Sequence, residues 1–146
     1  MILKAIQLIP KGSEKFLHKT EETLLKETCY FAAQLQLPSG NYPSSLGKTD
    51  DLLVHFCHGA PGFIPFLCEA YKFYKDGVFK ECALKAGECV WKKGILKKGN
   101  PMCHGIGGNS YMLHTLSTIC EEDQERCKWK YRSLLFTQLT YEKVLQ

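Results

Sequence analysis

The sequence predicts an all-α protein of stacked helical hairpins, and three observations support this fold class. Apolar residues recur at helical spacing in several segments, and no stretch of convincing length alternates as a strand would. The tripeptide Cys-His-Gly occurs at both 57–59 and 103–105, a separation of 46 residues, and each copy is followed by a second glycine at the same offset, Gly62 and Gly108. A repeat of this length suits one hairpin per unit, with neighbouring hairpins burying each other's apolar faces.

The first helix is expected to follow Ser13, since serine caps helix N-termini well and apolar residues recur with helical period after it. Pro38, Ser39 and Gly40 should end this helix. Residues 41–48 are rich in turn formers and have no periodicity, so they are expected to form a loop that leads to the first Cys-His-Gly.

The second and third helices are expected at about 61–74 and 79–93. Proline is tolerated in the first helical turn, where its missing N–H loses no partner, so Pro61 fits a helix start. The Asp-Gly pair at 76–77 should separate the two helices, and Gly94 should terminate the second of them. Gly87 lies inside that helix and indicates a close helix contact.

A loop at 97–101 leads to the second Cys-His-Gly, followed by helices at about 107–119 and 123–145. The repeating unit is therefore helix, loop, Cys-His-Gly, helix. Because repetition places equivalent loops at the same end of a helical stack, Cys57 and Cys103 should meet across neighbouring repeats.

Length and composition favour a single domain at 1–146 with a real core, given 45% hydrophobic residues. The net charge of +4 comes mostly from lysines interleaved with acidic residues, which disfavours a nucleic-acid partner. No window reaches the length of a membrane span. Eight cysteines without a signal-peptide pattern indicate reduced thiols in the cytoplasm, where clustered Cys and His favour metal binding or catalysis.

Cys57, His58, Cys103 and His104 are donors that zinc prefers. Both motifs precede predicted helix starts, where the helix dipole lowers a thiol pKa. Two alternatives stay open on spacing alone: buried core residues at helix junctions, or a closed structural zinc site that uses all four donors. The other six cysteines are expected to be core or half-buried thiols: Cys29, Cys68, Cys82, Cys89, Cys120 and Cys127.

Four segments carry a resemblance to the eukaryotic LanC-like proteins, relatives of the bacterial lanthionine cyclases. They read Pro-Ser-Gly-Asn-Tyr-Pro at 38–43, Asp-Leu-Leu-Val-His-Phe-Cys-His-Gly-Ala-Pro-Gly at 51–62, Gly-Ile-Leu-Lys-Lys-Gly at 94–99 and Cys-His-Gly-Ile-Gly-Gly-Asn at 103–109. The similarity is specific from about residue 38 to residue 109 and looser on both flanks.

The resemblance implies a partial arc of an α/α toroid with a zinc-binding core at about 50–120. Carried over by position, the zinc ligands would be Cys57, Cys103 and His104, with the fourth position open to an incoming thiol. In the family that thiol is glutathione, added to dehydroalanine or dehydrobutyrine residues in proteins. His58 would lie beside the metal as a proton shuttle, with His55 as a second candidate that is more simply a loop or core histidine.

The sequence also departs from the family pattern. Phe56 replaces a usual tryptophan, and only two His-Gly dipeptides occur, so the upstream histidine and acidic residue of the family have no counterpart. We therefore expect a partial LanC-like chain that binds zinc but adds glutathione poorly. The alternative is a non-catalytic module that binds zinc and glutathione. The expected location is the cytoplasm, with peripheral association at the plasma membrane through the basic loop at 92–98 as an alternative to a solvated rim.

Overall fold

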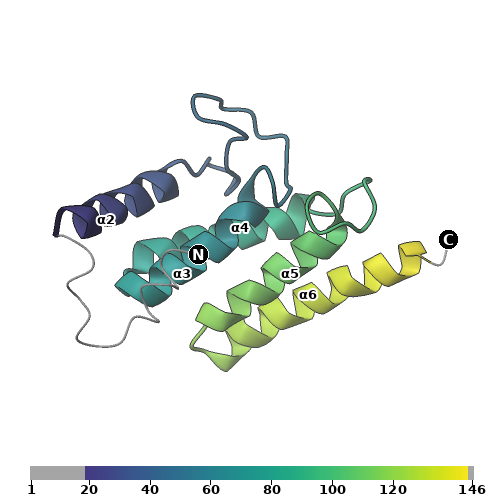
Figure 1. The fold of residues 1–146 in the computed structure, drawn as a ribbon. Helices are drawn as coiled ribbons and strands as arrows, with labels where there is room; N and C mark the ends of the chain where they lie inside the picture. The colour runs from purple at the N-terminus through teal and green to yellow at the C-terminus, as the bar shows by residue number, and fades with distance from the viewer. Residues whose placement is uncertain (1–18, 145–146) are drawn as a thin grey trace.

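A computed structural model describes residues 19–144, with side chains described for 21–141. This part of the chain contains α-helices and one short 3₁₀-helix and no β-strand, which confirms the all-α class (Figure 1). The elements are α2 (Lys19–Gln34), α3 (Ala60–Tyr74), α4 (Gly77–Lys93), α5 (Ile106–Leu116), η2 (Ser117–Ile119) and α6 (Asp123–Val144). None of the described helices is long and apolar enough to span a bilayer. The expected cap at Ser13 lies outside the described residues.

Two helical hairpins form the body of the molecule. Helices α3 and α4 pair across a short turn, α5 and α6 pair across η2, and contacts between α3 and α5 join the two hairpins (Figure 1). The turn after α3 is made by Lys75, which adopts a left-handed conformation (φ 56°) and donates its backbone N–H to the Tyr71 carbonyl. Asp76 then caps α4, because its carboxylate accepts a hydrogen bond from the Val78 N–H at 3.0 Å.

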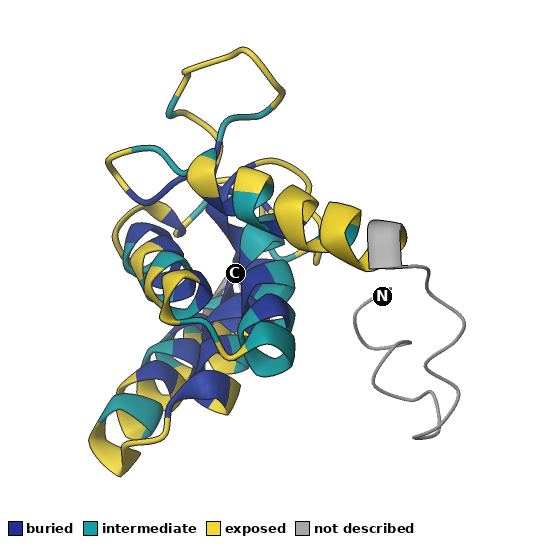
Figure 2. Ribbon diagram, turned by 90° about the vertical axis from the view of Figure 1, so that its left-hand side faces the viewer, coloured by how far each residue is buried: buried dark blue, intermediate teal, exposed yellow. Residues whose placement is uncertain are grey.

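The core lies where the helices face each other, as the buried residues turned inward in Figure 2 show. Its largest fully buried apolar side chains come from the loop before α3 and from α3, α4, α5 and α6: Tyr42, Ile64, Leu67, Phe79, Val90, Ile106, Met112, Leu113, Leu116, Trp129 and Phe136. Gly87 makes the predicted close contact, since a β-carbon there would lie 2.3 Å from Leu116 Cδ1 and 2.7 Å from Trp129 Cη2.

One helix ends earlier than the sequence predicts, and one ends at the predicted residue. Helix α5 stops at Leu116 and continues as the 3₁₀-helix η2 to Ile119, whereas one helix was expected over this range. Gly94 ends α4 as predicted, but with a right-handed conformation (φ −83°). Glycine is needed there for space, because a β-carbon would lie 2.4 Å from the Val90 carbonyl oxygen.

Candidate metal centre

The two Cys-His-Gly motifs lie side by side, as the repeat predicts. The backbone N–H of Cys57 donates to the carbonyl of Cys103 at 3.2 Å, and the two thiols are close enough to influence each other's pKa. Each cysteine stands three residues before the helix that follows it, α3 or α5. The contact between these two inner helices therefore brings together thiols that are far apart in the sequence.

Gly62 and Gly108, three residues after the glycine of each Cys-His-Gly, allow both loops to fold back over a helix start. A β-carbon on Gly62 would lie 2.2 Å from the carbonyl oxygen of Phe56, and one on Gly108 would lie 1.9 Å from that of Met102. Phe56 and Met102 are the residues directly before the two cysteines, so the same backbone approach occurs in both repeats. Any side chain at either glycine would push the cysteine loop away from its helix.

Buried Asn41 fastens the first cysteine loop from outside. Its Oδ1 accepts the Ala60 N–H at 2.7 Å, which satisfies a free donor at the start of α3. Its Nδ2 donates to the Leu53 carbonyl at 3.0 Å and to the Asp51 carboxylate at 2.9 Å. Asp51 is in turn paired with Lys93 at the end of α4, 2.8 Å away.

Buried Asn109, on α5, joins the first cysteine loop to the end of α4. Its Nδ2 donates to the carbonyl of Val54, in the first loop, at 3.1 Å and to that of Gly94, at the end of α4, at 2.8 Å. Asn41 and Asn109 lie in the segments that carry the LanC-like resemblance, but their positioning role was missed from the sequence. An amide that bridges distant backbone carbonyls leaves no periodic signal.

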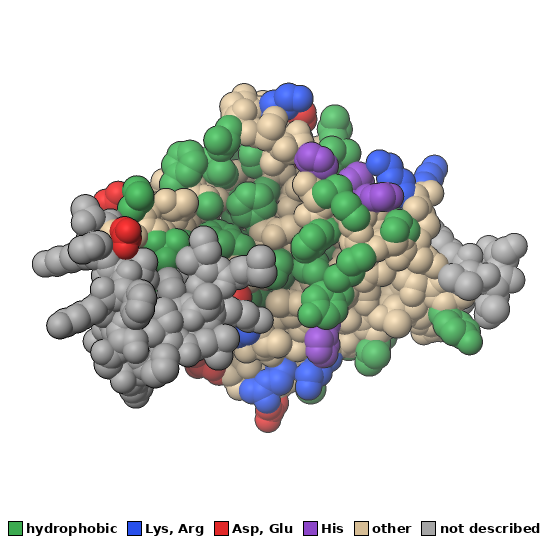
Figure 3. Space-filling view, viewed as in Figure 1, with side chains coloured by type: hydrophobic (Ala, Val, Ile, Leu, Met, Phe, Trp, Pro, Cys, Tyr) green, Lys and Arg blue, Asp and Glu red, His purple; other side chains and the backbone are tan. Residues whose placement is uncertain are grey.

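His55 lies near His58 and His104, and Figure 3 shows histidine side chains grouped at one edge of the viewed face, close to basic side chains. His58 and His104 are exposed, whereas His55 is buried. Burial lowers the pKa of His55, and the nearby charges of Lys98, His104 and His58 lower it further. His58 Nδ1 lies 3.3 Å from the Ser44 carbonyl oxygen. Because a carbonyl only accepts, this bond requires the proton on Nδ1 and leaves Nε2 as the open ring nitrogen.

The donors match zinc chemistry, but the three predicted ligands are not assembled. Among the described residues, no group of three or more Cys, His, Asp or Glu side chains is arranged to hold a metal ion. Cys57 and Cys103 lie close enough for their thiols to interact, and His104 is the third donor that the predicted site needs. His104 is exposed, so a change of its side-chain rotamer would not disturb the core. The residues therefore fit a zinc ion by donor type and by the thiol pair.

The expected lowering of the thiol pKa by the helix start is not found at Cys103. Its pKa is raised, first by the hydrogen bond with Cys57, then by partial desolvation and by the neighbouring Cys57 charge. When one of two neighbouring thiols is ionised, its negative charge opposes ionisation of the other. At Cys103 the effects of Cys57 and of desolvation outweigh any lowering of the pKa by the helix start.

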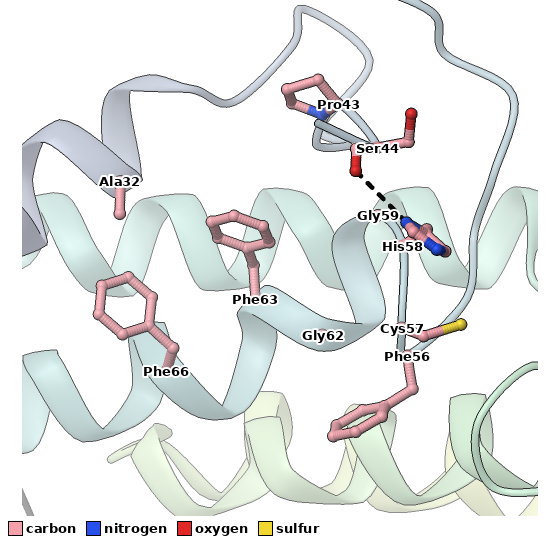
Figure 4. Close-up of a pocket in the computed structure, with 10 residues that line it drawn as sticks. All are labelled: Ala32, Pro43, Ser44, Phe56, Cys57, His58, Gly59, Gly62, Phe63 and Phe66. Atoms are coloured by element: carbon pink, nitrogen blue, oxygen red, sulfur yellow. Dashed lines mark hydrogen bonds between the residues drawn. The ribbon is translucent and has the colours of Figure 1, made fainter. Parts of the chain in front are cut away.

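A cavity of about 340 Å³ opens beside the first motif (Figure 4). It is lined by the loop at 43–44, the first motif and apolar side chains of α2 and α3, with Phe63 and Phe66 pointing into it. The Cys57 sulfur points away from these rings. Cys57 therefore lines the cavity while its sulfur is turned away from the two phenylalanine rings.

Five of the other six cysteines have the expected burial. Cys29, Cys68, Cys89 and Cys120 are buried and Cys82 is half-buried. The prediction was wrong for Cys127, which is exposed on the first turns of α6. Helical spacing alone does not place it, because α6 covers the core with only one face.

A model of the family described as "Lanthionine synthetase C-like protein" matches residues 5–143. The chain belongs to this family. The resemblance stated from the four segments is thereby confirmed, and the helical architecture is consistent with part of a LanC-like toroid.

Two curated relatives are similar in sequence to this LanC-like chain. Glutathione S-transferase LANCL1 of Danio rerio is 41% identical over 114 residues, which cover 78% of this chain and 27% of that protein. LanC-like protein GCL1 of Arabidopsis thaliana is 44% identical over 79 residues, 53% of this chain and 18% of that protein. The LanC-like chain thus spans about a quarter or less of each relative. The zinc ligands, the role of His58 and the bounds of the domain stay predictions.

Proposed function

We propose that this LanC-like chain supplies the metal-binding part of a site that adds the thiol of glutathione to dehydroalanine or dehydrobutyrine residues in proteins. The observation that carries the proposal is the contact between Cys57 and Cys103, which joins two repeats at their thiols. The LANCL1 relative is named a glutathione S-transferase, which supports glutathione as the incoming thiol.

Cys57 and Cys103 would hold zinc together with His104, and the fourth position would stay open. When bound, zinc lowers the pKa of an incoming thiol, so that the thiolate is available at neutral pH. Asn41 and Asn109 hold the loop of Cys57 against α3 and the end of α4 by the hydrogen bonds described above. These contacts preorganise the backbone of the first motif before any ligand arrives.

The proton needed by the reaction is assigned to His58. The thiolate sulfur forms a bond to the β-carbon of the dehydroamino acid, the π electrons move toward the carbonyl as an enolate, and the α-carbon must then take up a proton. With Nδ1–H held by the Ser44 carbonyl, His58 Nε2 is the atom that carries this proton.

The test is zinc-dependent addition of glutathione to a peptide containing dehydroalanine, followed by mass spectrometry. We expect slow addition that Cys57→Ser and Cys103→Ser abolish and that Cys127→Ser, at an exposed thiol on α6, leaves unchanged. His58→Ala should retain zinc and slow the addition by about 10²-fold or more. Full activity of Cys57→Ser would contradict the proposal, and full activity of His58→Ala would contradict the role of His58.

The second candidate is a module that binds zinc and glutathione without catalysis. It is favoured by the presence of only two His-Gly dipeptides in the sequence. Calorimetric binding of glutathione to the zinc-loaded chain, with no adduct formed on the peptide, would support this function. Adduct formation above the rate of the zinc-free chain would exclude it.

A further inference from the structure

The contact between Cys57 and Cys103 has a chemical consequence that does not require a metal. The two thiols are close enough to influence each other's pKa, and both residues are exposed. Their backbones are also joined directly, N–H to carbonyl, at 3.2 Å. A disulfide spans about 4.4–6.8 Å between α-carbons, and a direct backbone hydrogen bond between two cysteines holds their α-carbons near that range.

The loops that carry these cysteines are held in place from both sides. Asn109 ties the first loop to the end of α4, and the glycines after each cysteine allow the close backbone approach. Closing a bond between the sulfurs therefore needs side-chain rotation and little backbone movement. It would join residues on two different repeats.

A second pair of cysteines in the chain provides an internal comparison. Cys68 on α3 and Cys120 after η2 are near enough to interact electrostatically, but both are buried. Burial is the first cause that raises the pKa of each to about 12. Their thiols are shielded from water-borne oxidants and are rarely ionised.

We propose that Cys57 and Cys103 form a reversible intramolecular disulfide when a hydroperoxide oxidises the metal-free chain. One thiolate attacks the peroxide oxygen, giving a sulfenic acid and, for hydrogen peroxide, one water. The second thiol then attacks that sulfur, the S–S bond forms and a second water leaves. Two thiols are oxidised and one peroxide is reduced. A disulfide uses both sulfurs, so the same atoms cannot bind a metal as thiolates while the disulfide is present.

Peroxide treatment of the full chain, followed by alkylation, trypsin digestion and mass spectrometry, tests the bridge. Cys57 and Cys68 share the tryptic peptide 49–72, and Cys103 and Cys120 share 99–126. Fragmentation within the linked pair must therefore locate the bond. We expect it at Cys57 and Cys103, with their thiols lost together about ten-fold or more faster than those of Cys68 and Cys120. A dithiol reductant should restore them.

Cys57→Ser should lose the linked peptide and Cys127→Ser should retain it. A bond located at Cys68 or Cys120, sulfinic acid on Cys57 and Cys103 without a bridge, or a bridge found only between two chains would each overturn the proposal. Zinc added before the peroxide tests the proposed function separately. Slower bridging supports the shared metal site, and an unchanged rate contradicts that site while the disulfide stands.

Discussion

The glycines at Gly62 and Gly108 show how single residues set the position of each cysteine. Each faces the carbonyl oxygen of the residue before its cysteine, closer than a β-carbon tolerates. Because the obstacle is backbone and not the flexible end of a side chain, it cannot move aside without displacing the loop.

We predict that Gly108→Ala lowers the free energy of unfolding by about 2 kcal/mol or more, as steric conflict at a tightly packed position does. The measurement is a urea titration. The matched control is Gly77→Ala, at the start of α4, where a β-carbon meets nothing within 4 Å. There the free energy of unfolding should stay the same or rise by up to about 1 kcal/mol. Equal destabilisation by both substitutions would contradict the steric account.

Asn41 offers a second test at this scale. Asn41→Ala removes three hydrogen bonds at once, including that of the Ala60 N–H at the start of α3. Since unpaired buried polar groups are costly, we expect a loss of about 2 kcal/mol or more in the free energy of unfolding. Thermal and urea denaturation would measure it, with Ser45→Ala, exposed in the same loop, as control. An Asn41→Ala chain as stable as that control would show that the asparagine does not fasten the loop.

Helices α4 and α6 are linked by a charged cluster around Glu88. Its carboxylate lies 2.7 Å from both Arg132 and Lys128, and the Arg132 guanidinium lies over the rings of Trp91 and Trp129 at 4.8 and 4.9 Å from their centroids. Partial burial alone would raise the pKa of Glu88, but the hydrogen bonds from the two cations outweigh it and hold the pKa below its usual value.

This lowered pKa predicts how stability depends on pH. A carboxylate whose pKa is lower in the folded state stabilises the fold above its unfolded pKa, about 4.3 for glutamate, and this stabilisation is lost as pH falls through the folded pKa. Glu88→Gln should therefore flatten the loss of stability between about pH 5 and pH 3, by a modest amount since the group is partly exposed. Denaturant titrations at several pH values measure this. Glu81→Gln, exposed on α4, is the comparison, and identical profiles for both variants would contradict the prediction.

The helices themselves were largely predictable, because their signals are local. Proline at position 61, the Asp-Gly pair at 76–77 and Gly94 as a terminator place the bounds of α3 and α4 within a residue or two. The long-range contacts were only partly predictable. The repeat predicted that Cys57 would lie beside Cys103. The hydrogen bonds of the Asn41 and Asn109 amides were not predictable, because they join loop residues in segments without periodicity.

On the scale of the whole molecule, the two repeats pack against each other through α3, α4 and α5, and their motif loops meet at one end. The contact between α3 and α5 brings the two motif loops to the same end of the hairpins, and the thiols meet there (Figure 1). In the absence of a metal this arrangement favours a disulfide, and with zinc the same sulfurs would act as ligands. Both proposals therefore depend on the same geometric feature.

Titration of the reduced chain with cobalt, a spectroscopic substitute for zinc, tests the shared site most directly. We predict one equivalent bound per chain, with a thiolate-to-metal charge-transfer absorption that zinc abolishes by displacement. The absorption should be lost in Cys57→Ser and in Cys103→Ser, strongly weakened in His104→Ala, and retained in His58→Ala and Cys127→Ser. A chain that binds no metal under these conditions, or that keeps full binding when either Cys57 or Cys103 is replaced, would contradict the central claim.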